Sequence, residues 1–267
     1  MPGFLLYGHD DRGGAVLREK KQMKWLPFCL GLLLLAALIQ GLGALKGDRL
    51  VFPDVPSILR AFFALLRQPE TFLRLRTTLG HLLISLAFST VLGILLGLLE
   101  GLSGFCRQLL RPVMIFLRAL PMIVLVIIAM VLLPYRLVPV VGTCCVLVPL
   151  ISEAAAEGCR RIDRELIDVY RLNSDLNPSI LRHVYLPLMG GYLRQAYENA
   201  VGMGIKVTVT TEYLVQAAHS LGKAVYSTVY FNEYADLYAF ALLMILLVLA
   251  LSALPRALTA VQNRRAS

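Results

Sequence analysis

Long apolar stretches alternate with short polar connections along most of this chain of 267 residues. About 20 apolar residues, rising 1.5 Å each, cross a hydrocarbon core roughly 30 Å thick, so each such stretch predicts a membrane-spanning helix. Five stretches have this pattern: 25–44, 80–99, 113–133, 137–152 and 237–254. We therefore expect an all-α, polytopic membrane protein.

A sixth candidate span, residues 188–217, is interrupted by Arg194, Glu198, Lys206 and Glu212. At 100° per residue, these four side chains fall within about a third of the helix circumference. Charged groups at membrane depth cost at least a few kcal/mol and usually face a bundle interior or a watery cavity. They either line a translocation path or dimer seam, with Arg118 as a further candidate, or form internal ion pairs that only hold helices together.

Lysine and arginine in the connections predict the orientation of the six spans, because these residues are enriched on the cytoplasmic side. With the N-terminus inside, the inner segments hold sixteen of them and the outer segments eight. Both termini are then cytoplasmic, with a tail of residues 1–24 before one transmembrane domain of residues 25–262. The basic start followed by an apolar run also resembles a signal peptide, but the run exceeds the usual 7–15 residues and no cleavage site follows.

The composition agrees with a membrane protein and explains the charge of the chain. Hydrophobic residues make up 58% of the sequence, and the mean hydropathy is +0.71. The segment 57–67 spaces apolar residues as an amphipathic helix that would lie on the membrane surface, with its arginines reaching lipid phosphates. Lipid headgroups and topology therefore account for the net charge of +9, and no nucleic-acid partner is needed.

One polar connection, residues 157–187, is long and strongly patterned. Leu166, Val169, Tyr170 and Asn173 would share one face of a short helix. The polar run 174–177 before Pro178 then ends that helix, and a second short helix can follow up to Tyr185. The simplest interpretation is a solvated loop, but the apolar face around Tyr170 favours a rigid projection that enters a groove on a soluble partner.

The loop resembles the segment by which importer permeases dock on an ATP-hydrolysing subunit, whose pattern is E-A-A, three residues, G, nine residues, I-x-L-P. The residues that fall on this pattern are Asp168, Val169, Tyr170, Ser174, Val184, Leu186 and Pro187. Ser174 stands where the family has glycine, and the E-A-A positions are degenerate. Further similarities are a proline-marked stretch at 52–59 and the sequence FLRALP at 116–121, which resembles that family's arginine-x-x-proline turn opening the third span. Glu212, late in the span 188–217, also matches a position where such permeases carry a glutamate. Together they resemble permeases of the nitrate/sulfonate/taurine family of ATP-binding-cassette (ABC) importers.

The resemblance covers roughly residues 51–265 and implies a subunit of the bacterial inner membrane. Such a subunit moves a small solute delivered by an extracytoplasmic binding protein. It forms a two-fold dimer, here expected to be a homodimer, and pairs with two ATPase subunits through residues 157–187, the cytoplasmic coupling loop. The resemblance does not identify the substrate.

Motifs for other chemistry are missing from the sequence. The five cysteines and four histidines lack ligand spacing, so we expect no metal, and no cofactor is expected on this chain. No phosphate-binding G-x-x-x-x-G-K-[ST] occurs, so ATP hydrolysis would take place on a partner chain. Two alternatives stay open: a membrane anchor or assembly factor without transport activity, and a membrane-embedded enzyme that would use residues such as Glu153, Glu157 and His183.

Overall fold

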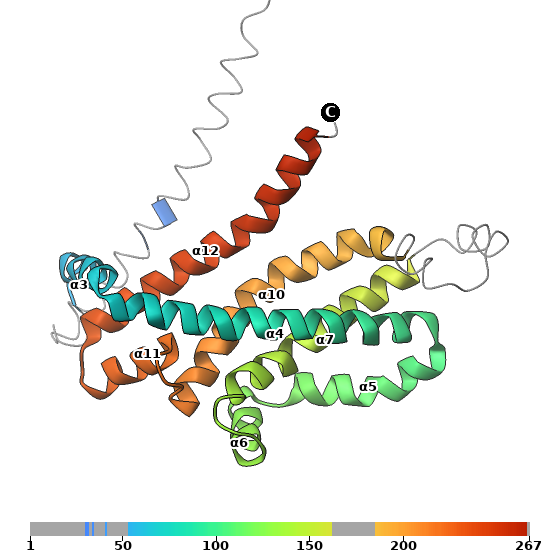
Figure 1. Cartoon of the computed structure of the whole chain (residues 1–267), viewed down its shortest axis with the longest axis horizontal. Coiled ribbons are helices and arrows are strands. Elements are labelled where there is room, and N and C mark those ends of the chain that lie inside the picture. The colour runs from blue at the N-terminus through green and yellow to red at the C-terminus, as the bar shows by residue number, and fades with distance from the viewer. Residues whose placement is uncertain (1–29, 32–33, 35–40, 42–52, 162–184, 266–267) are drawn as a thin grey trace, which may run out of the picture. The chain divides into compact units, whose positions relative to one another are not determined.

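The computed structural model describes residues 30, 31, 34, 41, 53–161 and 185–265, with side chains only up to residue 252. All regular elements in these ranges are helices, which confirms the expected all-α class. In chain order (Figure 1) they are α3 Val55–Arg67, α4 Pro69–Leu102, α5 Gly104–Ala119, α6 Met122–Leu132, α7 Val138–Arg160, α10 Leu186–Val215, α11 Leu221–Tyr230 and α12 Tyr234–Arg265.

The chain divides into two units, residues 1–59 and residues 60–267. In the first unit the longest described stretch is the start of α3, where Ser57 bonds through its backbone N–H and its hydroxyl to the carbonyl oxygen of Asp54. The helix predicted at 57–67 is thus confirmed as part of α3. The second unit carries all the other helices named above.

Each predicted span that falls in the described ranges is largely helical. Not every one is a single straight helix that is long and apolar enough to cross a membrane. By length and apolar character α4, α7 and α12 can cross a membrane, and α5 with α6 adds a fourth if that bent pair is one span. Helix α10 covers most of the weaker candidate 188–217 and is not in that group. The first predicted span, 25–44, lies almost wholly outside the described residues.

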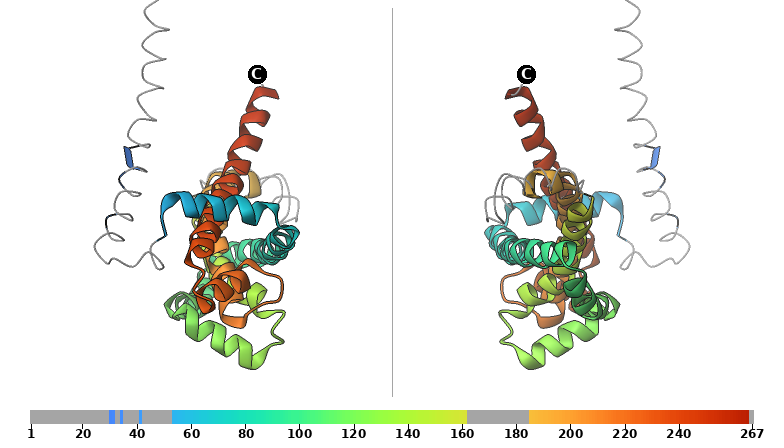
Figure 2. Two further views of the ribbon diagram at one scale, coloured as in Figure 1. Left: turned by 90° about the vertical axis from the view of Figure 1, so that its left-hand side faces the viewer. Right: turned by 90° about the vertical axis from the view of Figure 1, so that its right-hand side faces the viewer.

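The stretch 113–133 is broken into two helices that meet at 105° (Figure 2). The break follows from Pro121, because a proline disfavours helical geometry in the residue before it. Leu120 is accordingly extended, with φ −66° and ψ 126°, and it ends α5. Pro121 then precedes the first turn of α6. The sequence FLRALP is therefore a sharp turn between helices rather than part of one straight span.

Helices α4 and α7 pack closely because α4 presents small residues to its neighbour. Its buried positions include Ser85, Ser89, Gly93 and Gly97, and small residues of this kind let membrane helices approach. A Cβ atom added at Gly97 would collide with the carbonyl oxygen of Ser152 and the side chain of Ala155. This seam fixes the frame in which the other helices of the second unit are held.

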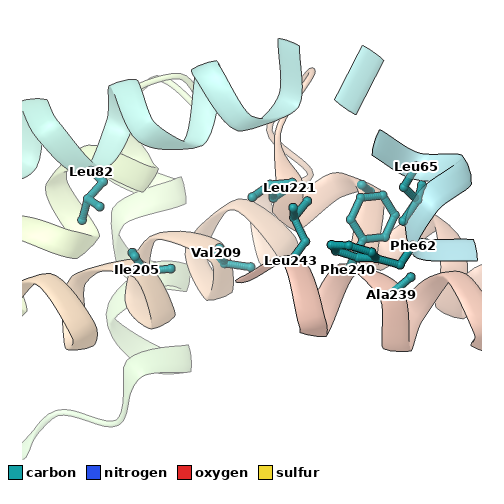
Figure 3. Close-up of a cluster of buried hydrophobic side chains, with 10 residues drawn as sticks. Phe62, Leu65, Leu82, Ile205, Val209, Leu221, Ala239, Phe240 and Leu243 are labelled. Atoms are coloured by element: carbon teal, nitrogen blue, oxygen red, sulfur yellow. The ribbon is translucent and has the colours of Figure 1, made fainter. Parts of the chain in front are cut away.

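Three buried clusters form around that frame. The largest joins α4, α10, α11 and α12 to Phe62 and Leu65 of α3, and Figure 3 shows Phe240 beside Phe62 at one end of it. A second cluster joins α4, α7 and the start of α10, and a third joins α6 to α7. Helix α10 therefore packs against nearly every other part of this unit.

Candidate functional site

The two ends of the long polar connection lie together at the end of α7 and the start of α10. Gly158 of α7 packs on Met189 of α10, where an added Cβ would lie 3.1 Å from the Met189 side chain. The Arg161 guanidinium lies over the Tyr192 ring, 5.9 Å from its centroid. Glu157 accepts hydrogen bonds of 2.8 Å from both Arg160 and Arg161, and its hydrogen bond raises the pKa of Arg161. The loop thus starts and ends on one joint between these helices.

Most of the residues expected to dock a partner lie outside the described residues: Asp168, Val169, Tyr170, Ser174 and Val184. Leu186 and Pro187 are described and form the first turn of α10, where proline fits because its missing N–H has no helical partner there. Tyr185, just before them, is buried in the cluster of α4, α7 and α10. The end of the docking pattern is therefore built into the helix bundle.

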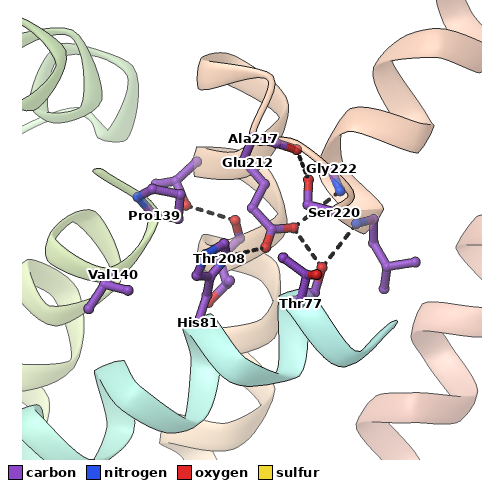
Figure 4. Close-up of polar contacts among 12 residues, drawn as sticks. Thr77, His81, Pro139, Val140, Thr208, Glu212, Ala217, Ser220 and Gly222 are labelled. Atoms are coloured by element: carbon purple, nitrogen blue, oxygen red, sulfur yellow. Dashed lines mark hydrogen bonds and ion pairs between the residues drawn. The ribbon is translucent and has the colours of Figure 1, made fainter. Parts of the chain in front are cut away.

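Glu212 is completely buried and joins three helices by hydrogen bonds (Figure 4). Its Oε2 accepts from the Thr78 hydroxyl of α4 at 2.8 Å and from the Gly222 N–H of α11 at 3.2 Å. Its Oε1 lies 2.7 Å from Nδ1 of His81. An ionised carboxylate only accepts hydrogen bonds, so His81 must carry a proton on Nδ1 when Glu212 is charged.

Helix α11 makes a second hydrogen bond to this network, through Thr78. The Thr78 hydroxyl accepts a hydrogen bond of 3.0 Å from the Leu221 N–H, so the first two backbone N–H groups of α11 both end on this network. The start of a helix leaves such N–H groups unpaired and favours negative charge nearby. Gly222 is required by space, because a Cβ added there would collide with Glu212. Glu212 therefore acts as an acceptor at the start of α11.

Arg118 lies at the end of α5 and holds this helix to α7. Its guanidinium bonds to the Pro149 carbonyl oxygen and to Glu153, each at 2.8 Å. It lines a mostly apolar cavity of about 460 Å³ among the helices α5, α6, α7 and α10, together with Met122, Cys145 and Met203. Arg118 and Glu153 are the charged groups of that lining, so an ion pair stands at the edge of an apolar chamber.

The remaining charged residues of α10 are not gathered around Glu212. Arg194 and Glu198 form an ion pair with a distance of 3.5 Å, and both are partly exposed. Lys206 is exposed and lines a separate apolar cavity of about 480 Å³ with α12. The four charged residues of α10 therefore have three different settings: an ion pair, an exposed lysine and a buried hydrogen-bond acceptor.

Sequence reasoning missed Thr78 and His81, the partners of Glu212 on α4. They precede Glu212 by 134 and 131 positions, so no local spacing connects them. A signal does exist in the apolar run of α4, where Thr78, His81, Ser85 and Ser89 recur at intervals of three or four. Such a polar stripe predicts the face that packs against other helices.

The comparisons with known proteins give one family. The model described as "Binding-protein-dependent transport system inner membrane component" matches residues 89–267, which is more than half of the chain. The match includes α10 with Glu212 and begins after Thr78 and His81. No curated protein matches the chain.

Proposed function

The chain belongs to the family of inner membrane components of binding-protein-dependent transport systems, and from this premise we propose that it carries a small solute across the membrane as one of two identical subunits. In this proposal an extracytoplasmic binding protein delivers the solute, and two separate ATPase subunits supply the energy. The family is one of transporter permeases, so no enzymatic reaction on this chain is proposed. The particular similarity to permeases for nitrate, sulfonates and taurine is part of the proposal.

The observation that best supports this function is the joint at the end of α7 and the start of α10. Any protein that grips residues 162–184 must act on both helices at once, since Gly158 contacts Met189 and Arg161 contacts Tyr192. Helix α10 then runs without interruption to Glu212 and so to α11. In the proposed orientation the joint is cytoplasmic and α11 is on the outer side, where the binding protein would dock.

Glu212 has a definite part in this proposal. A movement of α10 is passed to α11 through the Glu212–Gly222 hydrogen bond and to α4 through Thr78 and His81. The apolar chamber with Arg118 and Glu153 at its edge is the proposed section of the translocation path. Displacement of α10 changes this chamber, because Met203 and Val207 of α10 form one of its walls.

The docking step is tested by replacing Tyr170 with glutamate. A carboxylate on the apolar face of the loop should prevent burial against the ATPase, because burying an unpaired charge is costly. The variant should insert in the membrane but lose ATPase co-purification and uptake. Tyr135→Glu is a matched control, since Tyr135 is exposed and lies outside the loop. Normal ATPase binding and uptake by the Tyr170→Glu variant would contradict the docking assignment.

The general function is tested separately by looking for partners. A neighbouring gene for an ATPase and another for a secreted binding protein, followed by their co-purification with this chain, would support an importer. A chain that purifies without either partner, and whose deletion changes no uptake, would instead favour a membrane anchor or assembly factor.

A further inference from the structure

A second cavity, of about 610 Å³, lies between α5, the end of α4 and α7, and shares only Arg118 and Glu153 with the lining of the apolar chamber described above. This volume is typical of small-molecule sites, which measure roughly 300–1,000 Å³. Its lining is rich in charged side chains: Arg107, Arg111, Arg118, Arg160, Glu100 and Glu153. Four arginines against two glutamates give the cavity an excess of positive charge.

The arginines face the cavity because α5 is strongly amphipathic. Arg107, Arg111 and Arg118 lie within about 40° of one another on this helix. The opposite face exposes Phe105, Leu109 and Phe116, with 75%, 61% and 59% of their surface accessible. A helix with one basic and one apolar face is typical of a membrane–water boundary, where phosphate groups are concentrated.

Two polar atoms in the cavity wall are buried without a hydrogen-bond partner in the described part of the chain. One is the hydroxyl of Ser152, a residue that is 1% exposed, and the other is Oε1 of Glu100. Buried polar atoms without partners are rare in folded proteins because they lose their hydrogen bonds to water and gain none in return. The hydroxyl can donate to an anion, whereas the carboxylate oxygen needs a donor. Together they indicate a ligand that has both groups.

Among the described residues, two of the four arginines form salt bridges and two do not. Arg118 bonds to Glu153, and Arg160 bonds to Glu157. Within the described ranges, Arg107 and Arg111 form no salt bridge, although both line the cavity. Their guanidinium groups are separated by one helical turn and present N–H donors, which suit phosphate oxygens.

We infer that this cavity binds a phosphate ester that also carries a hydrogen-bond donor. Arg107, Arg111 and the Ser152 hydroxyl hold the phosphate oxygens, and Glu100 accepts from a hydroxyl or ammonium group of the same ligand. Two sources have this chemistry: the headgroup of a phospholipid such as phosphatidylglycerol, and a soluble ester such as glycerol phosphate. The site does not depend on the transport function.

The test measures ligand binding to the full-length chain in detergent by the shift of its thermal unfolding temperature. The probes are short-chain phosphatidylglycerol, phosphatidylcholine of the same chain length, and glycerol 1-phosphate. Phosphatidylcholine is the matched lipid, because its headgroup has neither net negative charge nor a hydrogen-bond donor. We expect phosphatidylglycerol to bind at least about tenfold more tightly than phosphatidylcholine.

Variants locate the binding in this cavity. Arg107→Gln with Arg111→Gln, and separately Ser152→Ala, should each weaken phosphatidylglycerol binding about tenfold or more. Arg136→Gln is the control, because it removes an exposed arginine outside the cavity. Ser152→Ala also removes an unsatisfied group, so this variant without ligand should be at least as stable as the original chain.

The soluble probe distinguishes the two sources. Binding of glycerol 1-phosphate as tight as that of phosphatidylglycerol, and lost in the same variants, assigns the site to a soluble ester. Binding of the lipid alone assigns it to a headgroup. Equal binding of both lipids without any effect of glycerol 1-phosphate would overturn the inference, as would cavity variants that bind like Arg136→Gln.

Discussion

At the scale of single residues, Glu212 is the feature that sequence and structure describe most differently. Its type and its position late in the predicted span 188–217 single it out in the sequence, whereas its partners belong to α4 and α11. Helical spacing predicts which residues of one helix share a face. It does not predict which face of another helix they meet, so Thr78 and His81 were not found.

Glu212→Leu should strongly reduce stability. The substitution leaves the Thr78 hydroxyl, the Gly222 N–H and the His81 ring without their acceptor, at about 1–3 kcal/mol for each unsatisfied group. A large fall in the thermal unfolding temperature is the expected result. Unchanged thermal unfolding would contradict the network.

Glu212→Gln tests the charge with little change of shape. Glutamine keeps one oxygen to accept from Thr78 and Gly222, and its NH₂ group can donate to a neutral His81 ring. Folding and assembly should therefore persist, while substrate-stimulated ATPase activity or uptake changes. Normal uptake with a lowered melting temperature would leave Glu212 as structural support only.

At the scale of helices, the sequence predicts where helices occur better than where they bend. All five predicted ranges within the described residues are helical, yet 113–133 turns by 105° between Leu120 and Pro121. The apolar run continues through the turn. Apolar residues indicate that a segment is surrounded by lipid or by other helices, but they do not indicate the direction in which the segment runs. The resemblance of FLRALP to an arginine-x-x-proline turn indicated the place of this turn, but its angle depends on the helices packed against it.

The seam between α4 and α7 can be tested with two glycines of the same helix. Gly97→Ala places a Cβ against the Ser152 carbonyl oxygen and the Ala155 side chain, so the helices must separate. We expect a loss of about 1–3 kcal/mol in the free energy of unfolding. Gly80→Ala is the control, because a Cβ there meets nothing within 4 Å. Equal stability of the two variants, measured by thermal unfolding, would contradict this packing.

At the scale of the whole molecule, the family and the helical membrane architecture follow from the sequence, but the orientation and the docking geometry do not. The loop pattern and the hydrophobic runs are local properties, so both can be identified from a single sequence. The side of the membrane rests on a balance of charges in which the segment 45–79 dissents with six basic residues. It therefore stays a prediction that needs a direct experiment.

Single cysteines in a cysteine-free variant would establish the orientation. Ser179 and Glu233 should react with an impermeant reagent from opposite sides of the membrane. Glu233 is preferable to its neighbour Asn232, which has a φ of 59° that disfavours cysteine. A cysteine at Gln108, an exposed position of α5, should react from the same side as Ser179. Reaction of Ser179 and Glu233 from one side would mean that α10 does not cross.

The length of α10 has a consequence for the membrane in which this protein works. Its 30 residues extend about 45 Å, roughly 15 Å more than the hydrocarbon thickness of a typical bilayer. As the proposed fifth span, the helix would have to tilt or project into water, and the balance between the two would change with lipid chain length. A thicker bilayer holds α10 more upright and a thinner one lets it lean. The position of α11, which is bonded to Glu212 near the end of α10, should then depend on the thickness of the surrounding lipid.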